Sequence, residues 1–171
     1  IVQNPKGDMF MASPSGFVSL IRRFDSKGII HDFIDTANPK YREAISNSKY
    51  KGLVQKGAVA TITQFSDIVF DPNGNLFTSD RLNHQIRKID TEGNVSIIAG
   101  TGDSDHYGDN GPALEAAFRD PNALASDSEG NIYIADTANN LIRKIDTKGI
   151  VTTFAGNGEH SDSGDGGSAL K

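Results

Sequence analysis

The chain has 171 residues, of which 36% are hydrophobic, and this length and composition are typical of a globular domain that buries its own core. Its 17 basic residues are outnumbered by 22 acidic residues, so the net charge of -5 argues against nucleic acid as a partner. The lack of cysteine excludes disulfides, thiolate zinc sites and a cysteine nucleophile, and no apolar run approaches the roughly 20 residues of a membrane-spanning helix.

The first segment, residues 1–35, predicts short strands, with a two-residue insertion around residues 14–17. It is the weakest of three internal copies of one pattern. The positions that it shares with the second copy are Gly7, Arg22, Asp25 and Gly28, which match Gly74, Arg87, Asp90 and Gly93. A repeat of this kind indicates that one structural unit is used several times along the chain.

Residues 36–65 hold a basic insertion followed by a linker. Between residues 36 and 56, five basic side chains stand against one acidic side chain, Glu43. Tyr41 and Tyr50 lie in the same segment, and their rings suit the face of a sugar or a peptide partner. A long loop that only caps the domain is the alternative.

The second and third copies, residues 71–100 and 127–156, lie 56 positions apart and are identical at about half of their positions. In the third copy, the alternation of Ile132 and Ile134 with smaller or polar residues predicts a strand. The four strands expected in this copy cover residues 123–126, 131–135, 141–145 and 150–155. The hairpins at 127–130 and 146–149 each begin with Asp and end with Gly, which favours tight turns. Little helix is expected, apart from a short turn at 114–118.

A repeated unit of four antiparallel strands indicates an all-β fold of the β-propeller type, with a solenoid as the alternative. On this interpretation the chain divides into three blades and their links. Blade 1 spans about residues 1–35, the insertion and linker 36–65, blade 2 66–100, a second linker 101–120, blade 3 121–156, and a link to a further blade 157–171.

Three motifs carry a family resemblance: GNIYIAD at 130–136, IRKID at 142–146 and TFAGNG at 153–158. Together with Asn83-His84, Asn140-Leu141 and the linkers at 108–118 and 164–170, they resemble the NHL-repeat family of β-propellers in its bacterial form. The resemblance implies a propeller of four-stranded blades, typically six, of which three are visible in this chain. A longer chain or a homodimer is therefore expected to complete the ring.

The order of antiparallel strands determines which loops share a face of the propeller. The connections from strand one to two and from three to four form one face, which carries the tight turns. The connections from two to three and the links between blades form the other face, and we expect the ligand there because function usually lies in long loops. The predicted ligand-binding residues are Tyr41, Tyr50, Arg81, His84, His106, Tyr107, Asn140 and His160.

Asp103, Asp105 and Asp109 lie in one link between blades and are weak candidates for calcium binding. Their spacing is not that of an EF-hand, and the resemblance assigns Asp109 to a turn in which the carboxylate bonds backbone amides. A structural role is therefore favoured, and no cofactor is expected. The histidines at 84, 106 and 160 share a face, but the repeats do not place them at equivalent positions, which argues against a metal cluster.

Several polar residues recur from blade to blade. Asp80 and Asp136, with Asn83 and Asn139, are predicted to bond the loop backbone, because function rarely demands one copy per blade. Arg22, Arg87 and Arg143 are predicted to bridge strands or neighbouring blades.

The sequence favours a binding scaffold without catalytic activity. We expect an extracytoplasmic or surface protein, bacterial by the resemblance, that holds a glycan or another protein. The alternative is a metal-dependent propeller enzyme of the lyase or lactonase type, with its site at the central channel. The first strands of the blades offer no matching set of metal ligands, which disfavours the enzyme. RNA binding, which some animal NHL proteins perform, needs a basic face, and the acidic links between blades argue against it.

Overall fold

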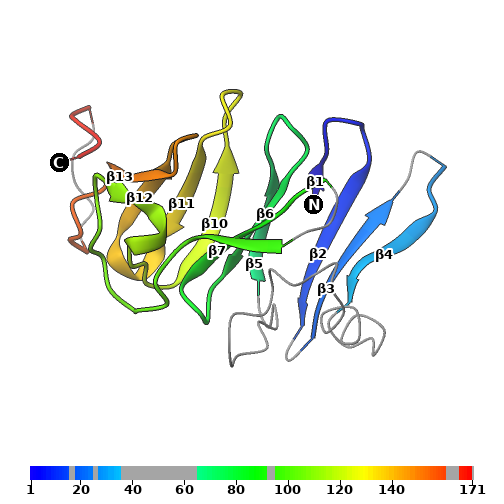
Figure 1. The fold of residues 1–171 in the computed structure, drawn as a ribbon, viewed down its shortest axis with the longest axis horizontal. Helices are drawn as coiled ribbons and strands as arrows, with labels where there is room; N and C mark the ends of the chain where they lie inside the picture. Colours follow the sequence, from blue (N-terminus) through cyan, green and yellow to red (C-terminus); the bar gives the residue numbers. More distant parts are fainter. Residues whose placement is uncertain (16–17, 25–26, 36–64, 92–94, 161–165, 171) are drawn as a thin grey trace.

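Three antiparallel sheets stand side by side in the computed structural model, which describes residues 1–15, 18–24, 27–35, 65–91, 95–160 and 166–170 (Figure 1). The first sheet, blade 1, contains β1 (Val2–Gln3), β2 (Met9–Ser15), β3 (Val18–Phe24) and β4 (Ile30–Asp35). The second sheet, blade 2, contains β5 (Phe65–Phe70), β6 (Leu76–Asp80), β7 (Gln85–Ile89) and β8 (Val95–Ala99). The basic insertion with Tyr41 and Tyr50 lies outside the described residues.

The third sheet, blade 3, contains β10 (Pro121–Ser126), β11 (Ile132–Asp136), β12 (Leu141–Ile145) and β13 (Ile150–Ala155). Each blade thus has four consecutive antiparallel strands, as the repeat predicts, and the all-β fold is confirmed. A fifth strand in blade 3 was not predicted. It is β9 (Gly111–Pro112), which pairs with the outer edge of β13 because the link from blade 2 returns along that edge.

The tight turns form where an aspartate precedes a glycine by three positions. In the β10–β11 turn, an oxygen of Asp127 accepts the backbone N–H of Asn131 at 2.9 Å, and Gly130 has a φ of +89°. In the β5–β6 turn, Asp71 accepts the N–H of Asn75 at 2.8 Å. Glycine adopts a positive φ without steric cost, so these local residues are sufficient to reverse the chain. The turns at 71–75, 127–131 and 146–150 lie at the top of Figure 1, on a surface that we call the turn face.

The carboxyl group of Asp127 should titrate at unusually low pH. A hydrogen bond from the side chain of Asn131 at 2.7 Å is the main cause that lowers the pKa of Asp127 from 3.8 to about 2. Because the folded-state pKa is depressed, the ionised carboxylate stabilises the fold above pH 3.8, and this contribution is lost as the pH falls towards 2. A carboxyl NMR titration should therefore give a midpoint near 2, and Asn131→Ala should raise it. A midpoint at 3.8 in the unsubstituted protein would contradict this prediction.

Two hydrophobic clusters join the three blades. The cluster between blades 1 and 2 contains Phe10, Ile21, Phe65, Ile68, Leu76, Ile89 and Val95. The cluster between blades 2 and 3 contains Phe77, Ile86, Ala99, Ala113, Ala116, Phe118, Ile132, Ile134, Ile145 and Val151. Polar contacts reinforce the second junction, since Leu124 N donates to Asp67 Oδ2 at 2.9 Å and Ser126 Oγ donates to the carbonyl of Phe70 at 2.7 Å. The first strands of blades 2 and 3 are therefore held directly against each other.

The face of blade 3 that points away from blade 2 is open among the described residues. On blade 2, Ile98 packs against the cluster shared with blade 3. The equivalent residue of blade 3, Phe154, lies 56 positions after Ile98 and is 52% exposed. Its ring packs edge-on against the ring of Tyr133, with 4.9 Å between the ring centroids. The outer face of blade 1 is similar, because Met9 and Ile30 are exposed there. Both ends of the three-blade array thus present apolar sheet surface.

Short 3-10 turns supply what helix there is in the described part of the chain. One, η2 (Ala113–Glu115), overlaps the turn expected at 114–118, and another, η3 (Thr137–Asn139), lies between β11 and β12. None of the helices in these described segments has the length and apolar character needed to cross a membrane.

Candidate functional site

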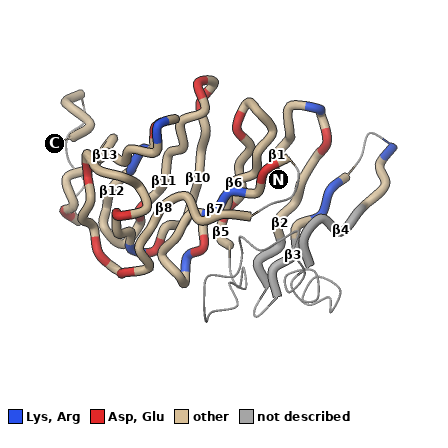
Figure 2. Tube along the Cα trace, viewed as in Figure 1, with Lys and Arg blue, Asp and Glu red and all other residues tan. Residues whose placement is uncertain are grey.

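Three loops meet on the side of the propeller opposite the turn face. Residues 81–84 join β6 to β7, residues 137–140 join β11 to β12, and residues 101–110 begin the link from blade 2 to blade 3. Asn139 Nδ2 donates to the carbonyl oxygen of Asp105 at 2.9 Å and so ties two of these loops together. We call residues 81–84, 101–110 and 137–140 the loop face. Its 101–110 loop is acidic, with red segments along it in Figure 2.

A buried carboxylate shapes the loop of blade 2. Asp80 is fully buried and accepts two hydrogen bonds from Asn83 Nδ2, at 2.9 and 3.0 Å. Arg87, which is also buried, donates to the same carboxylate through Nε at 2.9 Å. Asp80 also accepts the backbone N–H of Asn83 at 3.3 Å, so the predicted bond from Asp80 to the loop backbone is confirmed, as is the predicted bridge between strands by Arg87. The side chain of Asn83 bonds the Asp80 carboxylate and not the loop backbone.

The equivalent carboxylate of blade 3 has a similar role. Asp136 is fully buried and accepts Asn139 Nδ2 at 2.9 Å and the backbone N–H of Arg119 at 2.6 Å. Burial raises the pKa of Asp136, although these bonds and the charge of Arg143 act in the opposite direction. The 137–140 loop is therefore held to the sheet by groups that are not available to a ligand.

Arg143 connects the carboxylate of Asp136 to the chain segment between blades 2 and 3. Its side chain has no exposed surface, and it donates to Asp109 Oδ1 at 2.7 Å through Nη2 and at 3.0 Å through Nε. The expectation that Asp109 bonds backbone amides is wrong. Its partners are the side chains of Arg143 and Thr153, because the link folds over the guanidinium group. Asp109 thus compensates a buried positive charge.

Arg81 and His84, two of the predicted ligand residues, both contact Asp120. Arg81 donates to the Asp120 carboxylate through Nε and Nη2, and the second of these bonds measures 3.0 Å. His84 Nδ1 accepts the backbone N–H of Asp120 at 3.3 Å. This junction fixes the 81–84 loop against the chain entering β10. The side chain of Arg81 remains half-exposed, so it can also contact a partner.

Tyr107 lies on the acidic loop, and the residue is 44% exposed. Its hydroxyl donates to Asp103 Oδ2 at 2.6 Å, and Thr101 Oγ1 donates to the same oxygen at 3.2 Å. The bond to Asp103 is the main reason that the pKa of Tyr107 is raised. The hydroxyl is thereby oriented, and the ring is presented to solvent.

The structure does not bring the remaining predicted residues into one cluster. His106 lies 3.1 Å from the carboxylate of Asp105, and both side chains are exposed. Asn140 donates to the carbonyl of Gly158 at 3.4 Å and so joins the loop to the link that follows blade 3. His160 lies on that link and is exposed.

The three weak calcium candidates also point to different partners. Asp103 binds Tyr107, Asp105 lies beside His106, and Asp109 binds Arg143. Within the described ranges, no three His, Asp or Glu side chains are placed so that they could hold a metal ion together.

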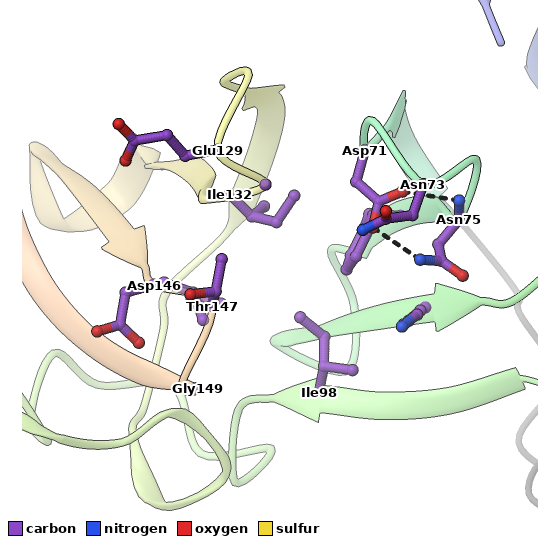
Figure 3. A pocket seen from close by; sticks show the side chains of 13 residues that line it. Asp71, Asn73, Asn75, Ile98, Glu129, Ile132, Asp146, Thr147 and Gly149 are labelled. Atoms are coloured by element: carbon purple, nitrogen blue, oxygen red, sulfur yellow. Dashed lines mark hydrogen bonds between the residues drawn. The ribbon is translucent and has the colours of Figure 1, made fainter. Parts of the chain in front are cut away.

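A pocket of about 280 Å³ lies on the turn face, between blades 2 and 3, where sequence reasoning expected no site (Figure 3). Residues from both blades line it: Asp71, Asn73, Asn75, Phe77, Lys88, Ile98, Glu129, Gly130, Ile132, Ile145, Asp146, Thr147 and Gly149. Sequence reasoning also missed Leu82, which is 59% exposed on the loop face. A signal for it existed, since Leu82 is an apolar residue in an otherwise polar loop.

Comparison with known proteins supports the repeat assignment. A family model described as the teneurin NHL domain matches residues 101–167. Teneurin-1 of Gallus gallus is 35% identical over 103 residues, which are 52% of this chain and 4% of that protein. The chain therefore spans only a small part of this relative.

Solved structures share the fold. An auxiliary nutrient binding protein from Bacteroides thetaiotaomicron matches with a TM-score of 0.57 and 21% identity, over 92% of this chain and 35% of that one. Virginiamycin B lyase from Staphylococcus aureus matches with a TM-score of 0.52 and 16% identity, over 89% of this chain and 39% of that one. At these identities the likeness concerns the fold alone. The match of residues 101–167 to the teneurin NHL domain agrees with the repeated motifs and the three four-stranded sheets, so the NHL-repeat family of β-propellers is supported for this chain.

Proposed function

We propose that the chain is part of a binding scaffold without catalytic activity, which engages a protein or a glycan through the loop face. The observation that carries this proposal is a contrast on that face. The carboxylates beneath that face, Asp80 and Asp136, are buried and bonded to other protein groups, whereas Leu82 and Tyr107 on the face are 59% and 44% exposed.

This contrast suits recognition of a macromolecule. Tyrosine and arginine are among the residue types enriched at the centres of protein interfaces, and an exposed leucine on the same face adds apolar area that a partner can bury. Leu82, Tyr107 and the half-exposed Arg81 supply such a set. Because the buried bonds already hold the loops, little conformational entropy is lost when a partner binds. A protein partner is therefore favoured, and a glycan partner would rely more on Tyr41 and Tyr50.

An extracytoplasmic location and a bacterial source remain predictions from the linker motifs, and animal teneurins are among the relatives that match. The open faces of blades 1 and 3 support completion of the ring by further blades, from a longer chain or from a second copy. Exposed Phe154 would then be covered as Ile98 is covered within this chain.

The proposal is tested by substituting Leu82 and Tyr107 together with serine. We would screen the unsubstituted protein against immobilised glycans and displayed extracellular protein domains, and then measure the affinity of each hit by calorimetry. The double variant should weaken binding by tenfold or more, because removal of central interface residues commonly costs about 1–2 kcal/mol or more.

The matched control is Leu114→Ser, which removes a leucine of similar exposure, 56%, from outside the loop face. Its affinity should equal that of the unsubstituted protein. If the double variant binds every hit unchanged, the loop face is not the binding surface. If a hit is chemically converted, the scaffold is an enzyme and the proposal is wrong.

A further inference from the structure

The pocket on the turn face is a second candidate site, and it is independent of the proposed function because it lies on the opposite side of the propeller. It opens between the β5–β6 turn of blade 2 and the β10–β11 and β12–β13 turns of blade 3 (Figure 3). All of its lining residues are described, and they belong to two adjacent blades. Its volume of about 280 Å³ is at the lower limit of ligand pockets, which usually measure ~300–1,000 Å³. A single small ring is therefore the largest ligand that it suits.

The inner wall of the pocket is apolar. Phe77, Ile132 and Ile145 are at most 6% exposed, and Ile98 packs on the same cluster. Figure 3 shows the side chains of Ile98 and Ile132 pointing into the space between the blades. A ligand that enters here places an apolar surface against these side chains and removes them from water.

Polar groups with unused bonding capacity surround this wall. Lys88 Nζ lies 5.9 Å from the centre of the Phe77 ring, and it has no hydrogen bond or ion pair with any described residue. The Asn73 amide and the Thr147 hydroxyl are likewise unbonded within the described segments. The side-chain amide of Asn75 donates to Asp71 Oδ2 at 2.7 Å, which orients the carboxylate and leaves Asn75 Oδ1 as an acceptor.

The charges around the pocket select against an ionic ligand. An anion would gain the ammonium group of Lys88 but would also meet the carboxylate of Asp71, whereas the carboxylates of Glu129 and Asp146 point away from the space between the blades (Figure 3). A cation would gain the carboxylate of Asp71 but would meet the ammonium group of Lys88. A neutral ligand with hydroxyl groups avoids both repulsions. Its hydroxyls can donate to a carboxylate and accept from the ammonium group.

We propose that this pocket binds a neutral polyhydroxylated ring, such as a single sugar residue. The C–H face of the ring packs against Ile98 and Ile132, and its hydroxyls bond Lys88, Thr147 and the Asp71–Asn75 pair. The pocket is thus suited to one class of ligand, a polyol with one apolar face. Binding of this ligand does not depend on a macromolecule at the loop face.

The test uses the whole chain with isoleucine δ1-methyl groups labelled for NMR. D-glucose, D-galactose and myo-inositol are titrated separately, with acetate and ethylammonium as charged probes. At least one polyol should shift the methyl signals of Ile98, Ile132 and Ile145 saturably, while Ile134, which is buried away from the pocket, stays in place. Lys88→Met and Thr147→Val should each weaken this binding about tenfold.

Lys144→Met is the matched control, because Lys144 lies 56 positions after Lys88 and covers Tyr133 as Lys88 covers Phe77. It should leave the affinity unchanged. An unmoved Ile134 signal in each variant shows that the fold is retained. The proposal is overturned if no polyol gives a saturable shift, if only acetate or ethylammonium does, or if Lys144→Met weakens binding as much as Lys88→Met.

Discussion

Replacement of Arg143 by methionine should lower the free energy of unfolding by about 3–5 kcal/mol, the usual cost of removing one partner from a buried ion pair. The side chain of Arg143 has no exposed surface, and it lies 2.7 Å from Asp109 and 3.5 Å from Asp136. Methionine fills part of the volume but leaves the buried carboxylate of Asp136 without its cation. Chemical denaturation at neutral pH measures the loss.

The same variant should be less impaired in acid. Burial already raises the pKa of Asp136, and loss of the Arg143 charge, which opposes this effect, raises it further. A group with a raised folded-state pKa favours the fold at low pH, and this contribution is lost as the pH rises through that pKa. The difference in stability between the variant and the unsubstituted protein should therefore shrink as the pH falls.

Arg81→Met is the matched control for Arg143→Met, because it breaks an arginine–aspartate pair whose arginine is 50% exposed. Pairs of this kind contribute about 0–1 kcal/mol. Equal losses in the two variants would mean that burial of Arg143 has no energetic consequence, contrary to the argument above.

Replacement of Gly100 by alanine should cost on the order of 2–5 kcal/mol, the sum of backbone strain and steric overlap. Gly100 has a φ of +96°, and a Cβ atom there would lie only 2.3 Å from the carbonyl oxygen of His84. The glycine allows the end of β8 to pass directly over the 81–84 loop. Gly156 repeats the arrangement against Asn140 at the same 2.3 Å.

Gly149→Ala separates the two causes. Gly149 also has a positive φ, +79°, but a Cβ atom there would meet nothing within 4 Å. The Gly149→Ala variant should therefore lose only the part of the free energy of unfolding that comes from the backbone conformation, about 1 kcal/mol. Thermal or denaturant unfolding of both variants gives the comparison. Similar losses in Gly100→Ala and Gly149→Ala would show that the close approach to His84 is not a source of strain.

The strands were predictable because their signals are local. The expected strands at 141–145 and 150–155 agree with β12 and β13 at both ends. The expected strand at 123–126 begins two residues later than β10, because the pairing with β11 is irregular between Pro121 and Leu124. A register shift of this kind depends on the partner strand and on the neighbouring blade, so it leaves little trace in a single segment.

The candidate sites were less predictable than the strands. Strand order placed Arg81, His84, Tyr107 and Asn140 on one face, but it could not show that Arg81 and His84 meet at Asp120, 39 and 36 residues away. The pocket on the turn face was missed because its walls come from segments between Asp71 and Gly149, and turns with ordinary sequences border it.

Alternation of apolar residues and Asp-to-Gly turns, repeated after 56 positions, were by themselves enough to predict a repeated unit of four antiparallel strands and the face on which each loop lies. The choice of a propeller over a solenoid came from the resemblance to NHL repeats. These features act over a few neighbouring residues, and the repeat displays them more than once. Only the tertiary structure decided that β9 joins the edge of blade 3, that Asp109 neutralises Arg143 and that a pocket remains between two blades. Each of these depends on how separate sheets pack, since burial and charge compensation involve side chains that are far apart in the chain.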